Sequence, residues 1–225
     1  MIEPSHERIA RRLLSIPAGR VTLEADLAIP ESARGVVAFA HGTGSSRHSP
    51  RNRFVARVLR DAGLATLLAD LLTVEEEALE AQTRHLRFDI PLLAERLADI
   101  TAYLATLLET QDLPLGYFGA STGAAAALVA AAEHPERVRA IVSRGGRPDL
   151  AGDALPQVRA PTLLIVGGAD VLVLDLNRAA LERLATEKAL EIVPGATHLF
   201  EEPGALDQVA RLAASWFDRH LGRPS

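Results

Sequence analysis

The sequence contains no cysteine among its 225 residues. Disulfides, thiolate zinc sites, iron–sulfur clusters and a cysteine nucleophile are therefore excluded together. A chain of this length builds a sizeable core without such cross-links, because folding buries roughly 70% of the surface that the unfolded chain exposes. We expect packing to stabilise the fold, and we expect no metal site.

Long apolar segments are also missing. The longest apolar runs, such as residues 124–132, fall well short of the ~20 residues that span a bilayer. The first 14 residues carry several acidic and basic side chains and no apolar stretch of signal-peptide length. We therefore expect a soluble, cytoplasmic protein that does not bind membranes.

The chain has no large excess of charge of one sign. Its formal net charge is −5, and acids and bases are mixed along the sequence. Five arginines cluster between residues 47 and 60, but apolar residues lie between them at helical spacing, which is typical of a solvated helix face. Nucleic-acid binding would need a larger basic excess, so no nucleic-acid partner is expected.

What the sequence does contain is an alternation of short apolar runs with amphipathic segments. The apolar runs are nearly unbroken, as strands covered on both faces should be. They predict six buried strands, at residues 35–40, 65–69, 115–118, 140–143, 162–166 and 189–193. The amphipathic segments predict five helices, at residues 51–62, 90–108, 123–132, 174–186 and 206–221.

This alternation indicates the α/β class, with a doubly wound and mostly parallel sheet covered by helices on both faces. Upstream, residues 21–29 alternate apolar with polar side chains, which predicts a one-sided antiparallel strand at the edge of the sheet. Only 18 residues separate Ser143 from Thr162, so a large cap domain is not expected there. No linker or repeat is evident, and residues 1–225 are interpreted as a single domain.

A GxSxG motif, Gly119-Ala120-Ser121-Thr122-Gly123, joins the predicted strand 115–118 to the helix that follows. In this strand–turn–helix context the serine oxygen stands exposed above the sheet. The sharp turn leaves too little room for side chains at positions 119 and 123. The motif therefore predicts that Ser121 is a nucleophile. The alternative is an ordinary loop whose serine caps the helix.

A serine hydroxyl is a poor nucleophile and needs an adjacent base. His198 is the best candidate, because it follows the last predicted strand at the carboxyl edge of the sheet, where ligands bind in doubly wound folds. Asp170, just past another strand end, would orient the imidazole. The chain order Ser121, Asp170, His198 is the order expected of such a fold. Asp149, after the preceding strand, is the alternative carboxylate.

The reaction also needs two backbone donors for the developing oxyanion. One is the amide of Thr122, which follows the nucleophile. The other is expected from the loop 41–46, where the amide of Thr43 is our choice ahead of that of Gly44. The same loop could instead bind phosphate, but it matches neither the ending of a nucleotide loop nor GxGxxG.

Two further features of the sequence have no single predicted role. Arg144 and Arg147 come after a strand end and could bind a substrate carboxylate, although a solvated or helix-capping role would also suit them. Residues 71–88, which contain three consecutive glutamates, are the candidate for a mobile flap, and an ordinary loop is the default interpretation.

With these residues identified, the chain resembles the dienelactone hydrolase-like branch of the α/β-hydrolase superfamily. The resemblance extends from about residue 21 to residue 221 and is carried by FAHGTGSSRHSPRN at 39–52, GYFGASTG at 116–123, GGAD at 167–170 and PGATH at 194–198. It implies an eight-stranded, mostly parallel sheet, no cofactor, and hydrolysis through a covalent acyl-enzyme. Dienelactone hydrolases proper carry cysteine in place of Ser121, and this departure favours a general serine esterase.

The sequence thus predicts a serine hydrolase that cleaves small-molecule carboxylic esters or lactones. Thioesterases, peptidases and acyltransferases use the same triad and stay open as alternatives. A non-catalytic binding module on the same fold is another, but such a module has no need of all three groups. Dehalogenase and epoxide hydrolase chemistry would require a carboxylate at position 121 and is excluded. The oligomeric state is left open.

Overall fold

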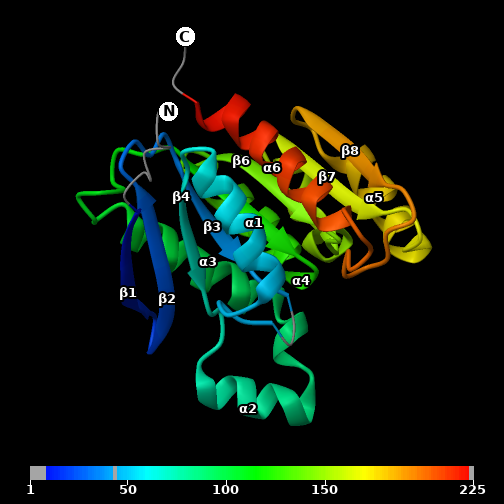
Figure 1. Cartoon of the computed structure of the whole chain (residues 1–225). Helices are drawn as coiled ribbons and strands as arrows, with labels where there is room; N and C mark the ends of the chain where they lie inside the picture. Colours follow the sequence, from blue (N-terminus) through cyan, green and yellow to red (C-terminus); the bar gives the residue numbers. More distant parts are fainter. Residues whose placement is uncertain (1–8, 43–44, 223–225) are drawn as a thin grey trace, which may run out of the picture.

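The computed structural model describes residues 9–42 and 45–222 of the chain (Figure 1). Its strands are β1 (Ile9–Ala18), β2 (Val21–Pro30), β3 (Val36–Ala40), β4 (Ala65–Ala69), β5 (Leu115–Ala120), β6 (Val138–Arg144), β7 (Thr162–Gly167) and β8 (Lys188–Val193). Its helices are α1 (Pro50–Asp61), α2 (Val74–Thr83), α3 (Ile90–Leu104), α4 (Thr122–Glu133), α5 (Val171–Arg183) and α6 (Ala205–Leu221), with short 3₁₀ segments η1 (Leu86–Phe88) and η2 (Pro148–Gln157).

The strands form one eight-stranded sheet in the order β1-β2-β4-β3-β5-β6-β7-β8. Strand β2 pairs antiparallel with β1 and with β4, and every other neighbouring pair is parallel. The predicted doubly wound, mostly parallel sheet is therefore confirmed. Its strand order and flanking helices are those of an α/β-hydrolase fold.

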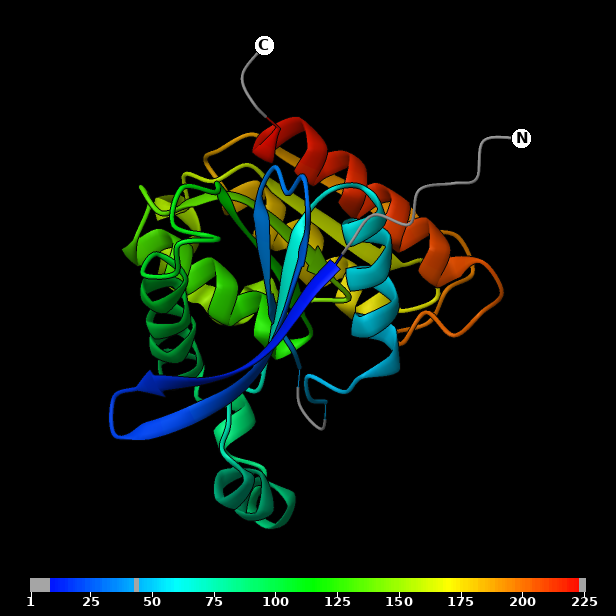
Figure 2. The ribbon, with the colours of Figure 1, turned by 60° about the vertical axis from the view of Figure 1, so that its left-hand side comes forward.

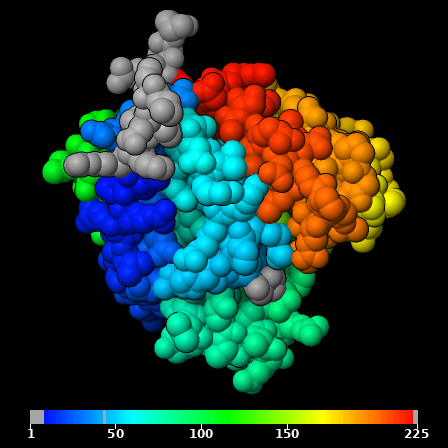
Figure 3. Space-filling view, in the orientation of Figure 1, coloured from blue at the N-terminus to red at the C-terminus, as the bar shows by residue number. Residues whose placement is uncertain are grey.

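Helices cover both faces of the central strands, which explains why these strands are unbroken apolar runs. Along β3, Val36 and Ala38 face the apolar cluster beneath α3 and α4, while Val37 and Phe39 face the cluster beneath α1 and α6. Figure 3 shows α1 and α6 side by side over the second face. The parallel strands therefore all end at one edge, the carboxyl edge, between two layers of helices.

The prediction that residues 21–29 form the edge strand is wrong, because β1 takes that place. Strand β1 was not predicted. Its buried side chains, Leu14, Ile16 and Ala18, alternate only in its second half, and its first half is exposed and carries two arginines. A tight turn at Gly19, with φ of +56°, connects β1 to β2, and Figure 2 shows the hairpin extending from the sheet.

The segment 71–88 folds into α2 and η1, and α2 projects beyond the carboxyl edge of the sheet (Figure 1). Helix α2 begins with a capping box, in which Thr73 accepts from the Glu76 amide and Glu76 accepts from the Thr73 amide. Arg96 of α3 holds the same glutamate with two hydrogen bonds of 2.5 Å. Polar contacts rather than a buried apolar stripe therefore fix α2.

The connection between β6 and β7 holds η2 alone, which agrees with the expected absence of a large cap there. Helix α3 ends at Leu104, four residues before the predicted end, and α5 begins at Val171, three residues before its predicted start. Within the described part of the chain, no helix has the length and apolar character needed to span a bilayer.

Candidate active site

Ser121 stands at a strained turn between β5 and α4. Its φ of 51° and ψ of −125° lie in a region that costs a residue with a side chain on the order of 1–3 kcal/mol. Close packing holds this turn. A Cβ added to Gly123 would lie 2.6 Å from the His41 carbonyl oxygen, and one added to Gly119 would lie 2.9 Å from the Ala124 nitrogen. The glycines of the motif therefore fulfil the steric role that the sequence predicted.

The Ser121 hydroxyl does not cap the helix that it precedes. Ser121 is the N-cap residue of α4, yet its side chain makes no capping hydrogen bond. Its main chain is fixed instead, since its carbonyl accepts from the Ala124 amide at 3.1 Å and from the Arg147 amide at 3.0 Å. The half-buried serine is thus held by its backbone, and its hydroxyl is not used for capping.

His198 and Asp170 are joined by a hydrogen bond of 2.7 Å between Nδ1 and Oδ2. Asp170 is the N-cap of α5 but makes no capping hydrogen bond, so its carboxylate points to the imidazole rather than to the helix. An imidazole that donates from Nδ1 keeps Nε2 as an acceptor. The alternative carboxylate, Asp149, accepts two hydrogen bonds from Arg147, at 2.8 and 2.7 Å.

The loop that follows β6 links Ser121 with His198. Gly145, at φ +50°, packs against the histidine so closely that an added Cβ would lie 3.2 Å from the His198 carbonyl oxygen and 3.6 Å from Nδ1. Two residues later, the Arg147 amide bonds to the Ser121 carbonyl. Ser121 and the His198–Asp170 pair therefore both contact the loop that follows β6, at the carboxyl edge of the sheet. Sequence reasoning gave Gly145 no role, although paired glycines after a strand end were a usable signal.

Backbone from two elements flanks the nucleophile on its other side. Thr122 begins α4 and is buried, and Gly42 follows β3. A Cβ added to Gly42 would lie 2.7 Å from the Ser121 Cβ, so only glycine lets the loop after β3 approach this closely. Thr43 and Gly44, the two residues considered for the second oxyanion donor, lie outside the described residues.

His41 anchors the loop after β3 as a neutral side chain. Its Nδ1 lies 3.0 Å from the Gly42 carbonyl oxygen, and its Nε2 accepts from the Leu71 amide at 3.2 Å. Burial lowers the pKa of His41 more than the Gly42 carbonyl and Asp70 raise it, which agrees with one N–H donor and one acceptor nitrogen. Sequence reasoning treated this histidine only as part of the loop.

Arg144 and Arg147 have different surroundings. Arg147 is paired with Asp149, and this hydrogen bond raises the pKa of its guanidinium. Arg144, at the end of β6, is only 8% exposed, and its Nε is buried without a hydrogen-bond partner. Its guanidinium lies 5.9 Å from the centre of the Phe200 ring. Burial, with Arg51 nearby, lowers the pKa of Arg144 to about 10.

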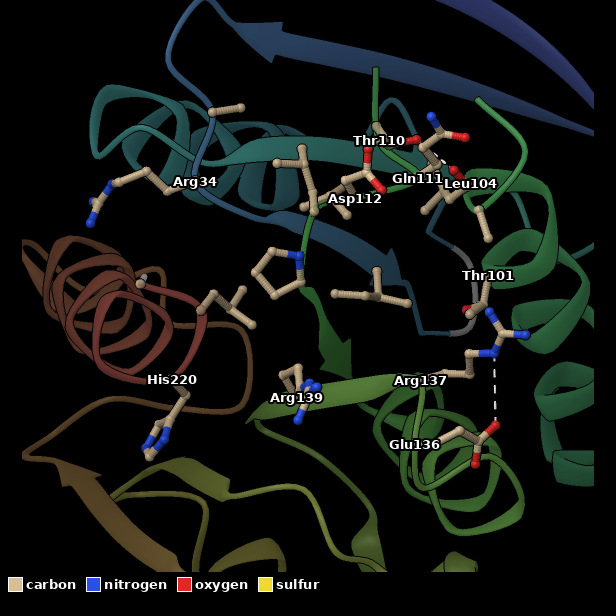
Figure 4. A pocket seen from close by; sticks show the side chains of 18 of the residues that line it. Arg34, Thr101, Leu104, Thr110, Gln111, Asp112, Glu136, Arg137, Arg139 and His220 are labelled. Atoms are coloured by element: carbon tan, nitrogen blue, oxygen red, sulfur yellow. Dashed lines mark hydrogen bonds and ion pairs between the residues drawn. The ribbon is translucent and has the colours of Figure 1, made fainter. Parts of the chain in front are cut away.

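The surface is hollowed at both edges of the sheet. A cavity of about 110 Å³ at the carboxyl edge is lined by Gly42 and Thr122 beside the nucleophile and by residues of α2 and α3. A groove of about 910 Å³ at the amino edge is lined by ionic side chains from several elements, among them Arg34, Arg139 and His220 (Figure 4). No group of three or more metal-ligating side chains occurs among residues 9–42 and 45–222.

A serine on a sharp turn after β5 and a histidine–aspartate pair after β8 and β7 thus lie at the carboxyl edge of an α/β-hydrolase fold. Residues 23–220 match the Dienelactone hydrolase family. The chain belongs to this family.

Similar proteins agree with this placement. A dienelactone hydrolase from Anabaena variabilis has a crystal structure with a TM-score of 0.93 and 62% identity, over 95% of this chain and 99% of that one. Est1E from Butyrivibrio proteoclasticus is 16% identical, with a TM-score of 0.77 over 92% of this chain and 98% of that one, and shares the fold.

A longer relative is known from Mycobacterium tuberculosis, under the name "Putative phosphoribosyl transferase". It is 61% identical over 211 residues, which are 94% of this chain and 47% of that protein. This chain therefore spans about half the length of the curated relatives that it matches.

Proposed function

We propose that this chain is a serine hydrolase that cleaves carboxylic esters or lactones through an acyl-enzyme. The observation that carries the proposal is the 2.7 Å hydrogen bond between His198 Nδ1 and Asp170 Oδ2, at the edge of the sheet where Ser121 stands on its strained turn. A histidine held in this way offers Nε2 as a base to a serine. Membership of the dienelactone hydrolase family supports the same chemistry.

In the first half of the reaction, Ser121 Oγ attacks the carbonyl carbon while His198 takes the hydroxyl proton. The amide of Thr122, and with it that of Thr43, donates to the oxyanion of the tetrahedral intermediate. His198 then gives its proton to the leaving oxygen, the carbon–oxygen bond of the ester breaks, and the acyl group stays on Ser121.

In the second half, water replaces the serine hydroxyl as the attacking group. His198 takes a proton from the water, the same amides stabilise the second tetrahedral intermediate, and the proton returns to Ser121 as the acid departs. Throughout the cycle, Asp170 orients the imidazole and stabilises the imidazolium. The cycle needs no group beyond these side chains and amides.

Of the two arginines, we propose that Arg144 rather than Arg147 meets the substrate, at an anionic group on its alcohol half. Arg147 already has a carboxylate partner in Asp149. A buried guanidinium without such a partner carries an effective desolvation penalty of several kcal/mol. A ligand anion would offset this penalty. Arg144 is also close to the site along the chain, because it directly precedes Gly145, which contacts His198.

The phosphoribosyl transferase name of the curated relatives belongs to proteins of which this chain matches 47%. The residues proposed for hydrolysis, Ser121, Asp170 and His198, all lie in the matched part, since the match covers 94% of this chain and the family match covers residues 23–220. We therefore assign the hydrolase chemistry to the matched part alone.

The Ser121→Ala variant tests the proposal. Removing the nucleophile of such a triad lowers kcat on the order of 10⁶-fold in a well-studied protease, so turnover of p-nitrophenyl butyrate should fall below detection. The circular dichroism spectrum and Tm should stay unchanged, because the hydroxyl makes no capping bond. Ser215→Ala, at an exposed position on α6, is the matched control and should keep full activity. Undiminished turnover in Ser121→Ala would contradict the assignment.

A further inference from the structure

The two halves of an ester must extend from Ser121 in opposite directions along the edge of the sheet. Ser121 follows β5, whereas His198 follows β8 and packs against the loop after β6, so the imidazole lies on the β6–β8 side of the nucleophile. The imidazole protonates the leaving oxygen, which places the alcohol half on that side. The acyl half therefore extends toward β3 and β4.

The cavity of about 110 Å³ lies on this second side of Ser121. Its lining includes Gly42, which follows β3 and approaches the Ser121 Cβ, and Thr122, whose amide is a proposed oxyanion donor. The cavity therefore lies beside the nucleophile. Leucines after β4 and on α3 give it an apolar lining, and α2 contributes Ala81.

We propose that this cavity is the acyl pocket and that it selects short, uncharged acyl groups. The inference rests on the proposed function and adds a substrate class to it. A cavity of about 150 Å³ holds benzene, so a cavity of about 110 Å³ holds roughly four carbon atoms. Acyl groups of up to about four carbons fit, and longer chains must extend past α2 into solvent.

The charge in the wall of the pocket acts against anionic acyl groups. Glu80 is buried but neutralised, because it pairs with Arg87 and accepts from the Leu86 amide. Glu77 also lines the pocket and adds a further negative charge. Burial, together with Asp70 and Glu80, raises the pKa of Glu77, which agrees with a wall that disfavours further negative charge. An acyl group with a free carboxylate would be repelled here.

A series of p-nitrophenyl esters tests the length limit. Each methylene that enters an apolar pocket should raise kcat/KM about fourfold, so the value should rise by about 15-fold from acetate through propionate to butyrate. Hexanoate and octanoate gain no further burial, and their kcat/KM should level off or fall. This result would mean that the natural substrates are esters of small, uncharged acids.

The Ala81→Leu variant tests whether α2 forms the wall of the pocket. Ala81 is exposed and helical, so leucine suits the position and should not disturb folding. The added side chain should lower the ratio of kcat/KM for butyrate to kcat/KM for acetate by about fivefold or more. Ala78→Leu, also exposed on α2 but outside the pocket lining, is the control and should keep the wild-type profile.

The Glu77→Gln variant tests the charge preference. It should raise the ratio of kcat/KM for a p-nitrophenyl hemisuccinate to kcat/KM for butyrate by about fivefold to tenfold, because it removes one like charge beside the substrate carboxylate. Glu75→Gln, on the exposed part of the same helix, should change neither value.

The outcomes separate this inference from the proposed function. A Ser121-dependent esterase that prefers octanoate, or that responds equally to Ala81→Leu and Ala78→Leu, would overturn the acyl pocket and leave the proposed function standing. A wild-type chain that hydrolyses neither an ester of the series nor a simple lactone would overturn both.

Discussion

The two edges of the sheet differ in the volume of their surface cavities, in the pairing of their charged side chains and in the strain of their backbone. The amino edge carries the larger groove, about 910 Å³, and several of its ionic side chains have partners of opposite charge, as Arg34 has in Asp218 and Arg137 in Glu136. The carboxyl edge carries a cavity of about 110 Å³ beside a serine with a strained backbone and an arginine whose Nε lacks a partner.

The volume of a surface hollow is therefore a poor guide to where a parallel sheet carries out chemistry. Strain and unpaired buried charge cost free energy, so they persist where function requires them. At the carboxyl edge, three glycines permit backbone contacts that any side chain would block, at positions 42, 119 and 123. The groove at the amino edge shows ionic pairing of the kind that an ordinary solvated surface displays.

Among variants that keep Ser121, Asp170→Asn should have the strongest effect. An amide would favour the wrong tautomer of His198, which in a comparable triad lowers kcat about 10⁴-fold. Asp149→Asn is the matched control, because this aspartate binds Arg147 and not the histidine, and kcat should change less than about tenfold. Steady-state kinetics on p-nitrophenyl butyrate measure both variants. A larger loss in Asp149→Asn than in Asp170→Asn would reverse the assignment.

A smaller effect is expected from Arg144→Met. The variant should keep or increase the stability of the fold but weaken the binding of anionic substrates. Replacing an unpaired buried cation by an apolar side chain should leave the free energy of unfolding unchanged or increase it by about 1–4 kcal/mol. KM for esters with an anionic alcohol half should rise about tenfold, while KM for neutral esters stays constant. Denaturant unfolding and paired kinetics provide both readouts. An equal rise in KM for both ester types would exclude an anion site.

A pH-dependent effect is expected where α2 is attached to the body of the protein. Arg96 lowers the pKa of Glu76 below its ordinary value of 4.5. The folded state therefore gains stability from this carboxylate above about pH 4.5, and the gain is lost as the pH falls through the lowered pKa. At pH 7, Glu76→Gln should lower the free energy of unfolding by about 1.5–3 kcal/mol, since Arg96 is buried.

Thermal unfolding at pH 7 and at pH 3 tests this prediction. The difference in Tm between the wild type and Glu76→Gln should shrink at the lower pH, because the stabilisation by the ionised glutamate is lost as the pH falls through its lowered pKa. Glu75→Gln, at an exposed position in the same turn, should show no difference at either pH. A difference that grows on acidification would contradict the proposed ion pair.

The smallest effect is expected at the amino edge. Arg139, on the exposed start of β6, lines the large groove, and Arg139→Gln should leave kcat/KM within about twofold of the wild type (Figure 4). Arg139 should have little effect because it lies at the far end of β6 from Arg144, and Arg144 is the end of the strand that borders the site. A loss approaching that of Asp170→Asn would remove the contrast between the two edges.

Much of the fold could be predicted because parallel strands covered on both faces are continuous apolar runs. The strand before Ser121 and the helix after it were located within a residue or two, and the steric need for Gly119 and Gly123 followed from the motif. The pairing of His198 with Asp170 was expected from their positions after strand ends, which a parallel sheet brings to one edge.

The elements that escaped prediction are those with little buried surface. In β1 only Leu14, Ile16 and Ala18 are buried, which is too short an alternation to recognise before the turn at Gly19. Helix α2 buries almost nothing apolar, and its hydrophobic periodicity is weak. Its capping box, Thr73 followed three residues later by Glu76, was nevertheless visible in the sequence and would have placed its start.

The remaining features of the site depend on contacts that no local pattern contains. Arg147 has a carboxylate partner because Asp149 lies beside it, whereas the Nε of Arg144 has no hydrogen-bond partner. The acyl pocket forms because α2 and α3 lie near the loop after β3. Such features depend on tertiary packing, which side-chain spacing along one strand or helix does not specify.

The central claim is that Ser121 is a nucleophile activated by His198, and active-site labelling tests it most directly. A fluorophosphonate probe should attach to the chain in a one-to-one ratio, with the adduct on the peptide that contains Ser121. Labelling should be lost in Ser121→Ala and in His198→Ala. An adduct on another residue, or undiminished labelling in Ser121→Ala, would contradict the account.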